Sequence, residues 1–336
     1  MSSVDQIIQQ INTVTTTITA IMYYTNFLLG VIGLSMNIFV LTQPSLRKTP
    51  CSMYFLSATF ANLFIILVIL PVRLLINTYN IDLTTYNIEY CKIQTFASFS
   101  TRALSCWLIT MACIDRYLHS SNNASMRRLS SSKTAKLSIG LLCGLMPVLY
   151  CHMLIFYNII QVKKPSGTMI YSCTLQDKTY SAFLNLWHLM IYSVCPSFAM
   201  LIFGCLVLRN IQINQRTVAR NANNARNNRR RNATLLRMLL AQVLLILITT
   251  GPRSIYQIYA LFTNNVVKNI IRTNVENSVG TILGVLSYFA HSTTFYIFTL
   301  SGSIFRKKVL KLFLRCSFCR ENRVHTTIDK RMPILY

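Results

Sequence analysis

Long apolar runs alternate with short polar segments over most of the chain. Each run is long enough to cross the hydrocarbon core of a membrane as a helix, which takes about 20 apolar residues. A helix satisfies its own backbone hydrogen bonds, so it is the structure that such runs favour in lipid. The pattern predicts an all-α membrane protein, a bundle of seven transmembrane helices in one domain over residues 21–301. The predicted helices cover residues 21–42, 53–76, 91–118, 137–160, 182–208, 233–262 and 278–300.

The connections between the runs differ in charge, which indicates how the chain is oriented. The connection 119–136 holds four basic residues and no acid, and the stretch 209–237 holds eight arginines and no acid. The connection 77–90 carries two acids and no basic residue. Because cytoplasmic loops carry the excess of Lys and Arg, we expect a multi-pass protein of the plasma membrane. Its N-terminal tail, 1–20, would be extracellular and its C-terminal tail, 320–336, cytoplasmic.

The composition agrees with a membrane protein, since 53% of the residues are hydrophobic and only 12% are charged. In a soluble chain the formal net charge of +25 would suggest nucleic-acid binding, and the arginine-rich stretch 209–237 would suggest an RNA-binding tail. Between two membrane helices this stretch is more simply a cytoplasmic loop, attracted to anionic lipid by about 1 kcal/mol per basic residue. We therefore expect membrane lipids, and no nucleic acid, as partners.

No residues in the sequence are candidates for catalysis. The five histidines are scattered, and none has a carboxylate partner in sequence. No enzyme activity, cofactor or metal site is therefore predicted. A transporter or channel is the alternative from a different class, but it would require internal repeats or paired charges at the middle of the membrane, and neither is found in the sequence.

The third run carries an acid and a base side by side at its inner end. The sequence there is Met111-Ala112-Cys113-Ile114-Asp115-Arg116-Tyr117, and Asp115 is the only carboxylate in the long apolar runs. Burying a charge in hydrocarbon costs at least about 2.5–3.5 kcal/mol, so a charge at this boundary indicates a function. Cys91 lies 25 positions before Arg116, at the outer end of the same run.

This arrangement resembles the third helix of the rhodopsin-like (class A) G-protein-coupled receptors. The resemblance implies a receptor that binds an extracellular ligand and activates heterotrimeric G proteins. It implies that Arg116 rests against Asp115 when inactive and meets the G protein's C-terminal helix when the sixth helix moves. A purely structural pair of Asp115 and Arg116 is the alternative. The residues that carry the resemblance are, in order, Cys91, Asp115-Arg116-Tyr117, Cys173, Pro196, Pro252 and Phe305-Arg306.

The cysteines can be sorted by the side of the membrane on which we expect them. Cys91 and Cys173 are the two at the outer face, where oxidation is allowed, and the family joins these positions in a disulfide; two free thiols are the alternative. At the other end, residues 302–319 are predicted to form a short amphipathic eighth helix on the membrane surface. Cys316 and Cys319 at its end are candidates for palmitoylation. Their spacing could instead bind a metal, but no second pair exists.

Several positions depart from the pattern of the family. Asn62 stands where the family carries a sodium-binding acid, so no sodium site is predicted. Pro252 keeps the kink of the sixth helix but follows Gly251 rather than the usual aromatic segment. In the seventh helix, Thr294 and Phe298 replace the Asn and Tyr of the Asn-Pro-x-x-Tyr motif. Since the inner end of the sixth helix also lacks a restraining acid, we expect a lowered barrier to activation and basal signalling.

The polar residues of the outer halves of the helices indicate the ligand class. Ser98, a candidate for contact with the ligand, stands where similar amine receptors carry an Asp, which argues against a monoamine. Arg73, Arg102 and Arg253 lie at the depth of ligand binding, with no helix carboxylate to neutralise them. We infer an anionic group on the ligand. For each arginine the alternative is a side chain that snorkels outward or binds backbone carbonyls. His188 and Tyr256 are further candidates for contact with the ligand.

Within the receptor fold, a neuropeptide or other ligand with an anionic group fits these features. The short tail, the tethered outer loop and the lack of an amine-binding acid favour a peptide. A chemosensory receptor for small organic acids is an alternative with the same fold. A non-signalling decoy or scaffold receptor is another, because the interior switch positions are altered.

Overall fold

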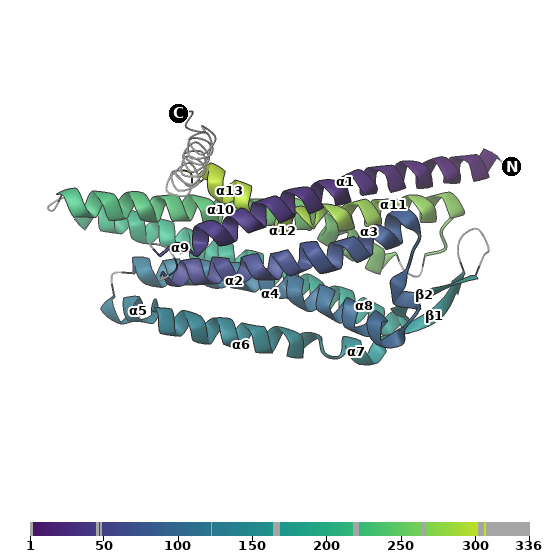
Figure 1. Ribbon diagram of the computed structural model, residues 1–336, viewed down its shortest axis with the longest axis horizontal. Helices are drawn as coiled ribbons and strands as arrows, with labels where there is room; N and C mark the ends of the chain where they lie inside the picture. The colour runs from purple at the N-terminus through teal and green to yellow at the C-terminus, as the bar shows by residue number, and fades with distance from the viewer. Residues whose placement is uncertain are drawn as a thin grey trace, which may run out of the picture.

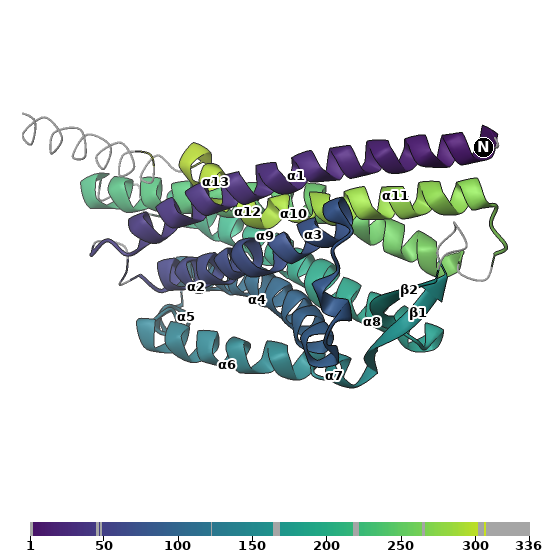
Figure 2. The same cartoon turned by 45° about the vertical axis from the view of Figure 1, so that its right-hand side comes forward.

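The computed structural model describes residues 3–44, 47, 49–121, 123–163, 169–217, 222–263, 266–301 and 306. Its helices lie side by side along one common direction (Figures 1 and 2). The first half of the chain forms α1 (Ser3–Leu41), α2 (Pro50–Phe64), the π-helical turn η1 (Ile65–Ile69), α3 (Leu70–Tyr79), the 3-10 turn η2 (Leu83–Thr85), α4 (Ile88–Ser120), α5 (Ala124–Leu129) and α6 (Ser132–Tyr150). The second half forms α7 (Met153–Phe156), β1 (Tyr157–Lys163), β2 (Met169–Leu175), α8 (Lys178–His188), the π-helical turn η3 (Leu189–Val194), α9 (Cys195–Thr217), α10 (Ala222–Phe262), α11 (Ile270–Leu286), α12 (Phe289–Ser292) and α13 (Thr294–Ser301).

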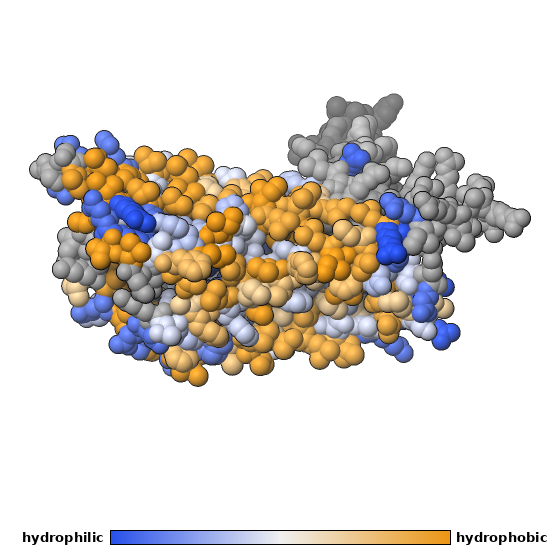
Figure 3. Space-filling view, turned by 180° about the vertical axis from the view of Figure 1, so that it is seen from behind, coloured by the Kyte–Doolittle hydropathy of each residue, from blue (hydrophilic) through white to orange (hydrophobic). Residues whose placement is uncertain are grey.

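The surface of the bundle matches a membrane environment. Figure 3 shows hydrophobic side chains over the middle of one face and hydrophilic ones gathered toward its two ends. Among the described residues, five helical stretches are long and apolar enough to cross a membrane. They are Val4–Leu41, Pro50–Tyr79, Ile88–Ser120, Ser132–Phe156 and Thr179–Asn210. α10 and α11 pack against the same bundle, α10 beside α9 and α11 beside α1.

Helix α4 lies at the centre of the packing. It contacts α2, α6 and α9, and its buried face includes Ala103, Leu108, Ala112 and Cys113. Small residues such as Ala103 and Ala112 let neighbouring helices approach closely in a membrane bundle. α4 therefore holds the outer residues near Arg102 and the inner residues near Asp115 in one rigid element.

The N-terminal segment is helical where a tail was expected. α1 begins at Ser3 rather than at residue 21, because its polar part satisfies its own hydrogen-bonding groups. Thr13, Thr15 and Thr17 each donate a side-chain hydrogen bond to the carbonyl four residues earlier. These bonds satisfy the threonine hydroxyl groups within the helix.

The expectation of a purely helical chain is wrong in one place. The helix predicted for 137–160 ends at Phe156, and β1 then pairs antiparallel with β2, with Ile159 opposite Cys173. β1 contains β-branched residues, which favour strands, and a strand partner follows within a few residues. The second outer connection is thus a β-hairpin, seen at the same end of the molecule as the N-terminus (Figure 1).

Two predicted helices contain a π-helical turn next to a proline. η1 precedes Pro71 closely and η3 precedes Pro196. Proline lacks an N–H group and its ring clashes with the carbonyl four residues earlier, which disturbs the α-helical ladder on its N-terminal side. The helix predicted for 182–208 is therefore α8, η3 and α9 in succession.

The seventh predicted helix, 278–300, is interrupted twice. α11 ends at Leu286, α12 spans only Phe289–Ser292, and α13 follows from Thr294. The Ser287 hydroxyl donates to the Gly284 carbonyl (2.7 Å) and the Thr293 hydroxyl to the Phe289 carbonyl. These bonds occur at the two interruptions, and such back-bonding commonly bends helices.

Some predictions fall on positions that cannot be compared with the structure. The eighth helix at 302–319 is described only at Arg306, which is exposed. Cys316 and Cys319, the side chain of Phe298 and the side chains of residues 213–239 lie outside the described part of the molecule. The palmitoylation sites, the lipid-bound basic loop and the missing acid at the inner end of the sixth helix therefore stay predictions.

Candidate ligand cavity and inner ion pair

A disulfide fixes the outer hairpin to the central helix. Cys91 lies in the first turn of α4, which Asn87 caps by accepting a hydrogen bond from the backbone N–H of Glu89 (2.7 Å). It is bonded to Cys173 of β2, with Cα atoms 5.7 Å apart. The predicted pairing of these two cysteines is confirmed. The bond holds β2 beside the outer end of α4.

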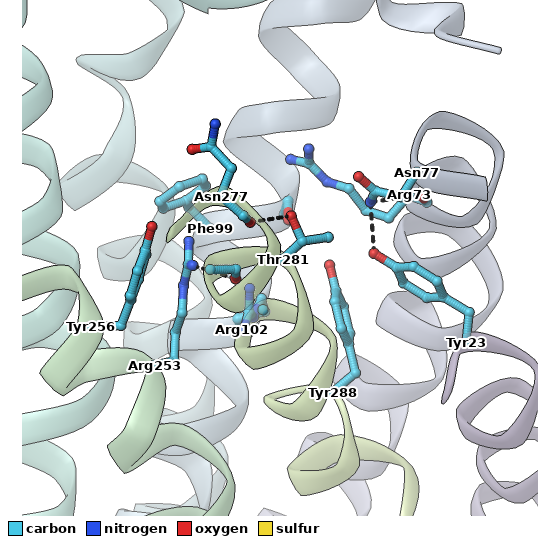
Figure 4. Close-up of a pocket in the computed structure, with 13 residues that line it drawn as sticks. Tyr23, Arg73, Asn77, Phe99, Arg102, Arg253, Tyr256, Asn277, Thr281 and Tyr288 are labelled. Atoms are coloured by element: carbon cyan, nitrogen blue, oxygen red, sulfur yellow. Dashed lines mark hydrogen bonds between the residues drawn. The ribbon is translucent and has the colours of Figure 1, made fainter. Parts of the chain in front are cut away.

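A cavity of about 470 Å³ opens between α1, α3, α4, α10 and α11. Most of its side chains are polar, and three of them are arginines (Figure 4). Five of the six predicted ligand contacts, Arg73, Ser98, Arg102, Arg253 and Tyr256, line this one cavity. The structure therefore brings together residues from three separate predicted helices, 53–76, 91–118 and 233–262. The remaining lining residues are Tyr23, Asn77, Phe99, Asn277, Gly280, Thr281, Gly284 and Tyr288.

His188, the sixth predicted contact, does not line the cavity. It is buried, with 6% of its surface exposed, and its Nδ1 is 3.0 Å from the Tyr150 hydroxyl. Its ring is stacked on Tyr192 with centroids 4.8 Å apart. His188 thus packs against Tyr150 and Tyr192 rather than lining the cavity, and its contact with a ligand stays a prediction.

Arg102 lines the cavity and lies between Arg253 and Tyr288 in the view of Figure 4. Its guanidinium lies 5.0 Å from the ring centre of Tyr192 and 4.9 Å from that of Tyr288, so two aromatic faces stabilise its charge. Its Nη2 donates to the Ser287 hydroxyl, at the first interruption of the seventh helix. Its Nε is buried without a hydrogen-bond partner among the described residues. Arg102 is therefore held in place but not neutralised.

The other two arginines approach the cavity from different sides. Arg253 donates from Nη1 to the Gly280 carbonyl (2.7 Å) and lies 5.6 Å from the ring centre of Tyr256. For part of the Arg253 guanidinium, the alternative of a bond to a backbone carbonyl is therefore confirmed. The Arg73 carbonyl accepts from the Asn77 side chain, which also donates to the Tyr23 hydroxyl (2.8 Å). Those bonds fix the backbone of α3 around Arg73.

None of the residues that line the cavity is acidic. Glu276 is close, since its backbone carbonyl accepts from the Tyr256 hydroxyl (2.8 Å), but its carboxylate is bound elsewhere. It pairs with Lys268 and with Arg272, and these hydrogen bonds, above all that from Lys268, lower the pKa of Glu276 to about 2. Glu276 lies just before the predicted seventh helix, 278–300, so it was not counted among the helix carboxylates. The cavity therefore carries an excess of positive charge.

A buried polar network connects the floor of the cavity with α2. The Asn62 side-chain oxygen accepts from the Ser105 hydroxyl and lies 2.9 Å from His291 Nδ1. Because that oxygen can only accept, His291 Nδ1 carries the proton, and Nε2 accepts from the Tyr192 hydroxyl at 3.2 Å. Tyr192 in turn packs on Arg102.

The sequence singled out Asn62 but not the residues that bind it. Ser105, Tyr192 and His291 were missed, although a histidine inside an apolar run is itself a signal of a polar partner. Thr294, a predicted switch position, is buried, and among the described residues its hydroxyl donates to two backbone carbonyls of α12, those of Ala290 and His291. It takes no part in the network.

The acid and base at the inner end of α4 form an ion pair. Arg116 Nη2 donates to Asp115 Oδ2 at 2.8 Å, and only 7% and 5% of the two side chains are exposed. The Ser130 hydroxyl, from the segment between α5 and α6, donates to Asp115 Oδ1 at 2.7 Å. The Tyr117 ring packs on Phe203 of α9. Ser130 is a partner that the sequence analysis did not name.

Comparison with known proteins gives one family. Residues 35–295 match the model of the 7 transmembrane receptor (rhodopsin family). A search of curated proteins found no match. The matched region covers more than half of the chain and contains the polar network, the inner ion pair and every residue of the cavity lining except Tyr23. The chain therefore belongs to the rhodopsin family of seven-transmembrane receptors.

Proposed function

We propose that this receptor binds an anionic group of an extracellular ligand in the cavity around Arg102 and activates heterotrimeric G proteins at the Asp115–Arg116 end. One observation carries the ligand class: Arg73, Arg102 and Arg253 line one cavity that has no acidic lining residue. Unneutralised charge at membrane depth is costly, and a ligand carboxylate, sulfate or phosphate would offset that cost. Guanidinium groups bind such anions through paired hydrogen bonds.

We also propose an orientation of the receptor in the membrane. α10 and the interrupted helix α11–α13 are the sixth and seventh spans, and the N-terminus is extracellular. The disulfide at Cys91 supports this orientation, because disulfides persist on the oxidising side of the membrane. The cavity then opens outward, and the Asp115–Arg116 pair faces the cytoplasm.

The cavity fits one end of a ligand rather than a whole peptide. Pockets of about 300–1,000 Å³ hold drug-sized molecules, and about 470 Å³ suits a terminal residue with its carboxylate. The tethered β1–β2 hairpin would contact the remainder of a peptide. A small organic acid is the second candidate, since it would fill the same volume without needing the hairpin.

Ligand binding can act on the bundle through Arg102. An anion that binds the Arg102 guanidinium would compete with the Ser287 hydroxyl, which accepts its hydrogen bond at the α11–α12 interruption. It would also change the position of Arg102 over Tyr192, which bonds to His291. Exchanging Ser287 for the ligand as the partner of Arg102 would favour one of two arrangements of the seventh helix. Transmission of a signal between two sites requires an element with two such arrangements.

The test measures G-protein activation in cells that express the full chain. A panel of peptides and organic acids is applied, each beside its neutral amide. We expect activation by one or more acids, a much weaker response to the matching amide, and no response from Arg116→Ala at equal surface expression. A response that does not distinguish acid from amide would contradict the anionic ligand. Silence from every compound and no basal signal would support a decoy or scaffold instead.

We expect Asp115→Asn to raise basal signalling severalfold, because removing the carboxylate charge weakens the hold on Arg116. A buried hydrogen bond to a charged group contributes about 1.5–3 kcal/mol, enough to shift a minor active population strongly. Second-messenger levels without ligand measure the effect at matched surface expression. Glu89→Gln, which neutralises an exposed acid at the other end of α4, is the control. Equal basal levels in Asp115→Asn and the unmodified receptor would contradict the restraint.

A further inference from the structure

The segment between α5 and α6 brings a serine hydroxyl to the inner ion pair. Ser130 follows α5 directly with φ −78° and ψ 71°, and Ser131 is extended with φ −123° and ψ 155°. The Ser130 hydroxyl donates to Asp115 Oδ1, while Arg116 holds Oδ2. One non-helical residue therefore supports the same carboxylate that restrains Arg116.

The residues before Ser130 also form a basic sequence pattern. The sequence Arg127-Arg128-Leu129-Ser130 places two arginines three and two positions before the hydroxyl. Protein kinases select substrates by such charge patterns, and basic residues before a serine are the pattern that basophilic kinases recognise. All three residues before Ser130 are exposed, so they are accessible to an acidic substrate groove.

The local structure can open to admit a kinase. α5 has six residues and none of them is buried, and a helix this short is marginal without packing. Unwinding it would leave the α6 N-cap at Ser131 in place, where the hydroxyl oxygen accepts from the backbone N–H of Thr134 at 3.2 Å. The segment can therefore become extended at little cost to the bundle.

We propose that Ser130 is a phosphorylation site for a basophilic serine kinase and that its phosphate regulates the Asp115–Arg116 pair. This rests on the proposed function, in which that end faces the cytoplasm and its ATP. The Ser130 oxygen attacks the γ-phosphorus of ATP and forms the new P–O bond. The bond from the γ-phosphorus to the bridging β-oxygen breaks, ADP leaves, and the hydroxyl proton passes to the base of the kinase.

The modification reverses the role of this side chain. A hydroxyl that donates to Asp115 becomes a group with a charge of about −1.5 to −2 at pH 7, which repels the carboxylate and accepts hydrogen bonds instead. Arg116 has an unused donor, since its Nε is buried without a partner among the described residues. The phosphate supplies a second anion for this guanidinium. Arg116 is then held more firmly, and G-protein activation falls.

The first experiment asks whether the site is used. The full receptor, reconstituted in lipid nanodiscs, is incubated with ATP and the catalytic subunit of a basophilic kinase, and phosphate on Ser130 is quantified by mass spectrometry. We expect nearly complete modification of Ser130. Arg127→Ala with Arg128→Ala should lower its rate about tenfold or more, which is about 1.4 kcal/mol. Lys133→Ala with Lys136→Ala, basic residues on the other side of the serine, should leave it unchanged.

The second experiment asks what the phosphate does. G-protein activation by the same nanodiscs is compared before and after kinase treatment, for the unmodified receptor and for Ser130→Ala. Treatment should lower activation severalfold in the unmodified receptor and have no effect on Ser130→Ala. Lack of phosphate at Ser130, or a phosphorylated receptor of unchanged activity, would overturn the proposal. Neither result touches the proposed function, which would fail only if the untreated receptor does not activate G proteins.

Discussion

Replacing Arg102 by glutamine lowers the potency of an anionic ligand by about 30-fold or more, which corresponds to at least about 2 kcal/mol. The expectation rests on the position of this guanidinium. It lies between the rings of Tyr192 and Tyr288 and carries a buried donor without a partner among the described residues. An anion that reaches it gains a hydrogen bond with little competition from water. Concentration–response curves for G-protein activation measure the shift.

The control for this substitution is a second arginine outside the cavity. Arg272→Gln removes a charge that already pairs with Glu276 at the outer end of α11, so ligand potency should stay within about threefold, the size of a surface ion-pair effect. The neutral amide of the ligand should be nearly as weak on Arg102→Gln as on the unmodified receptor. Equal potency of the acid on both receptors would exclude contact between Arg102 and the anionic group.

Replacing Cys91 or Cys173 by serine should sharply reduce receptor at the cell surface and its ligand response. The disulfide closes a loop with a sequence separation of 82, and loop-closure entropy gives an upper limit of about 4.5 kcal/mol for such a bond. The variant loses the restraint between β2 and the first turn of α4, the helix that supplies Ser98, Phe99 and Arg102 to the cavity. Surface labelling and thermal unfolding of the purified receptor measure the two effects.

The double variant tests whether the two cysteines act together. If the effects come from one bond, Cys91→Ser with Cys173→Ser should be no worse than either single change. Cys143→Ser, at an exposed free cysteine of α6, should behave as the unmodified receptor. Normal surface levels and unfolding temperature for Cys91→Ser would show that the hairpin is held without the disulfide.

The sequence predicted those residues of the site whose charge contrasts with the apolar sequence around them. Arg102, Arg253 and Asp115 are charged residues inside apolar runs, so the cost of burying them marks them without any knowledge of the fold. The disulfide could be assigned because the side of the membrane limits which thiols oxidise. Most helix positions followed from apolar length alone, although several boundaries moved.

Features that depend on contacts between distant segments could not be predicted. The bonds of Asn62 to His291 and Ser105 join three helices, and no local pattern specifies which polar residues meet. For the same reason, the sequence did not reveal that the His188 side chain packs against Tyr150 and Tyr192 instead of lining the cavity. At the two interruptions of the seventh helix the hydroxyl groups of Ser287 and Thr293 bond to the backbone of the preceding turn, and periodicity does not reveal where such breaks fall.

The unneutralised charge of Arg102 also places the receptor under the influence of the membrane potential. An electric field acts on any charge that stands inside the bilayer, and moving one full charge across 100 mV changes its energy by about 2.3 kcal/mol. If Arg102 leaves Ser287 for a ligand, each tenth of the membrane thickness that its charge moves adds about 0.2 kcal/mol at that voltage. Ligand affinity would then differ between resting and depolarised cells, with no change in the ligand or in the protein.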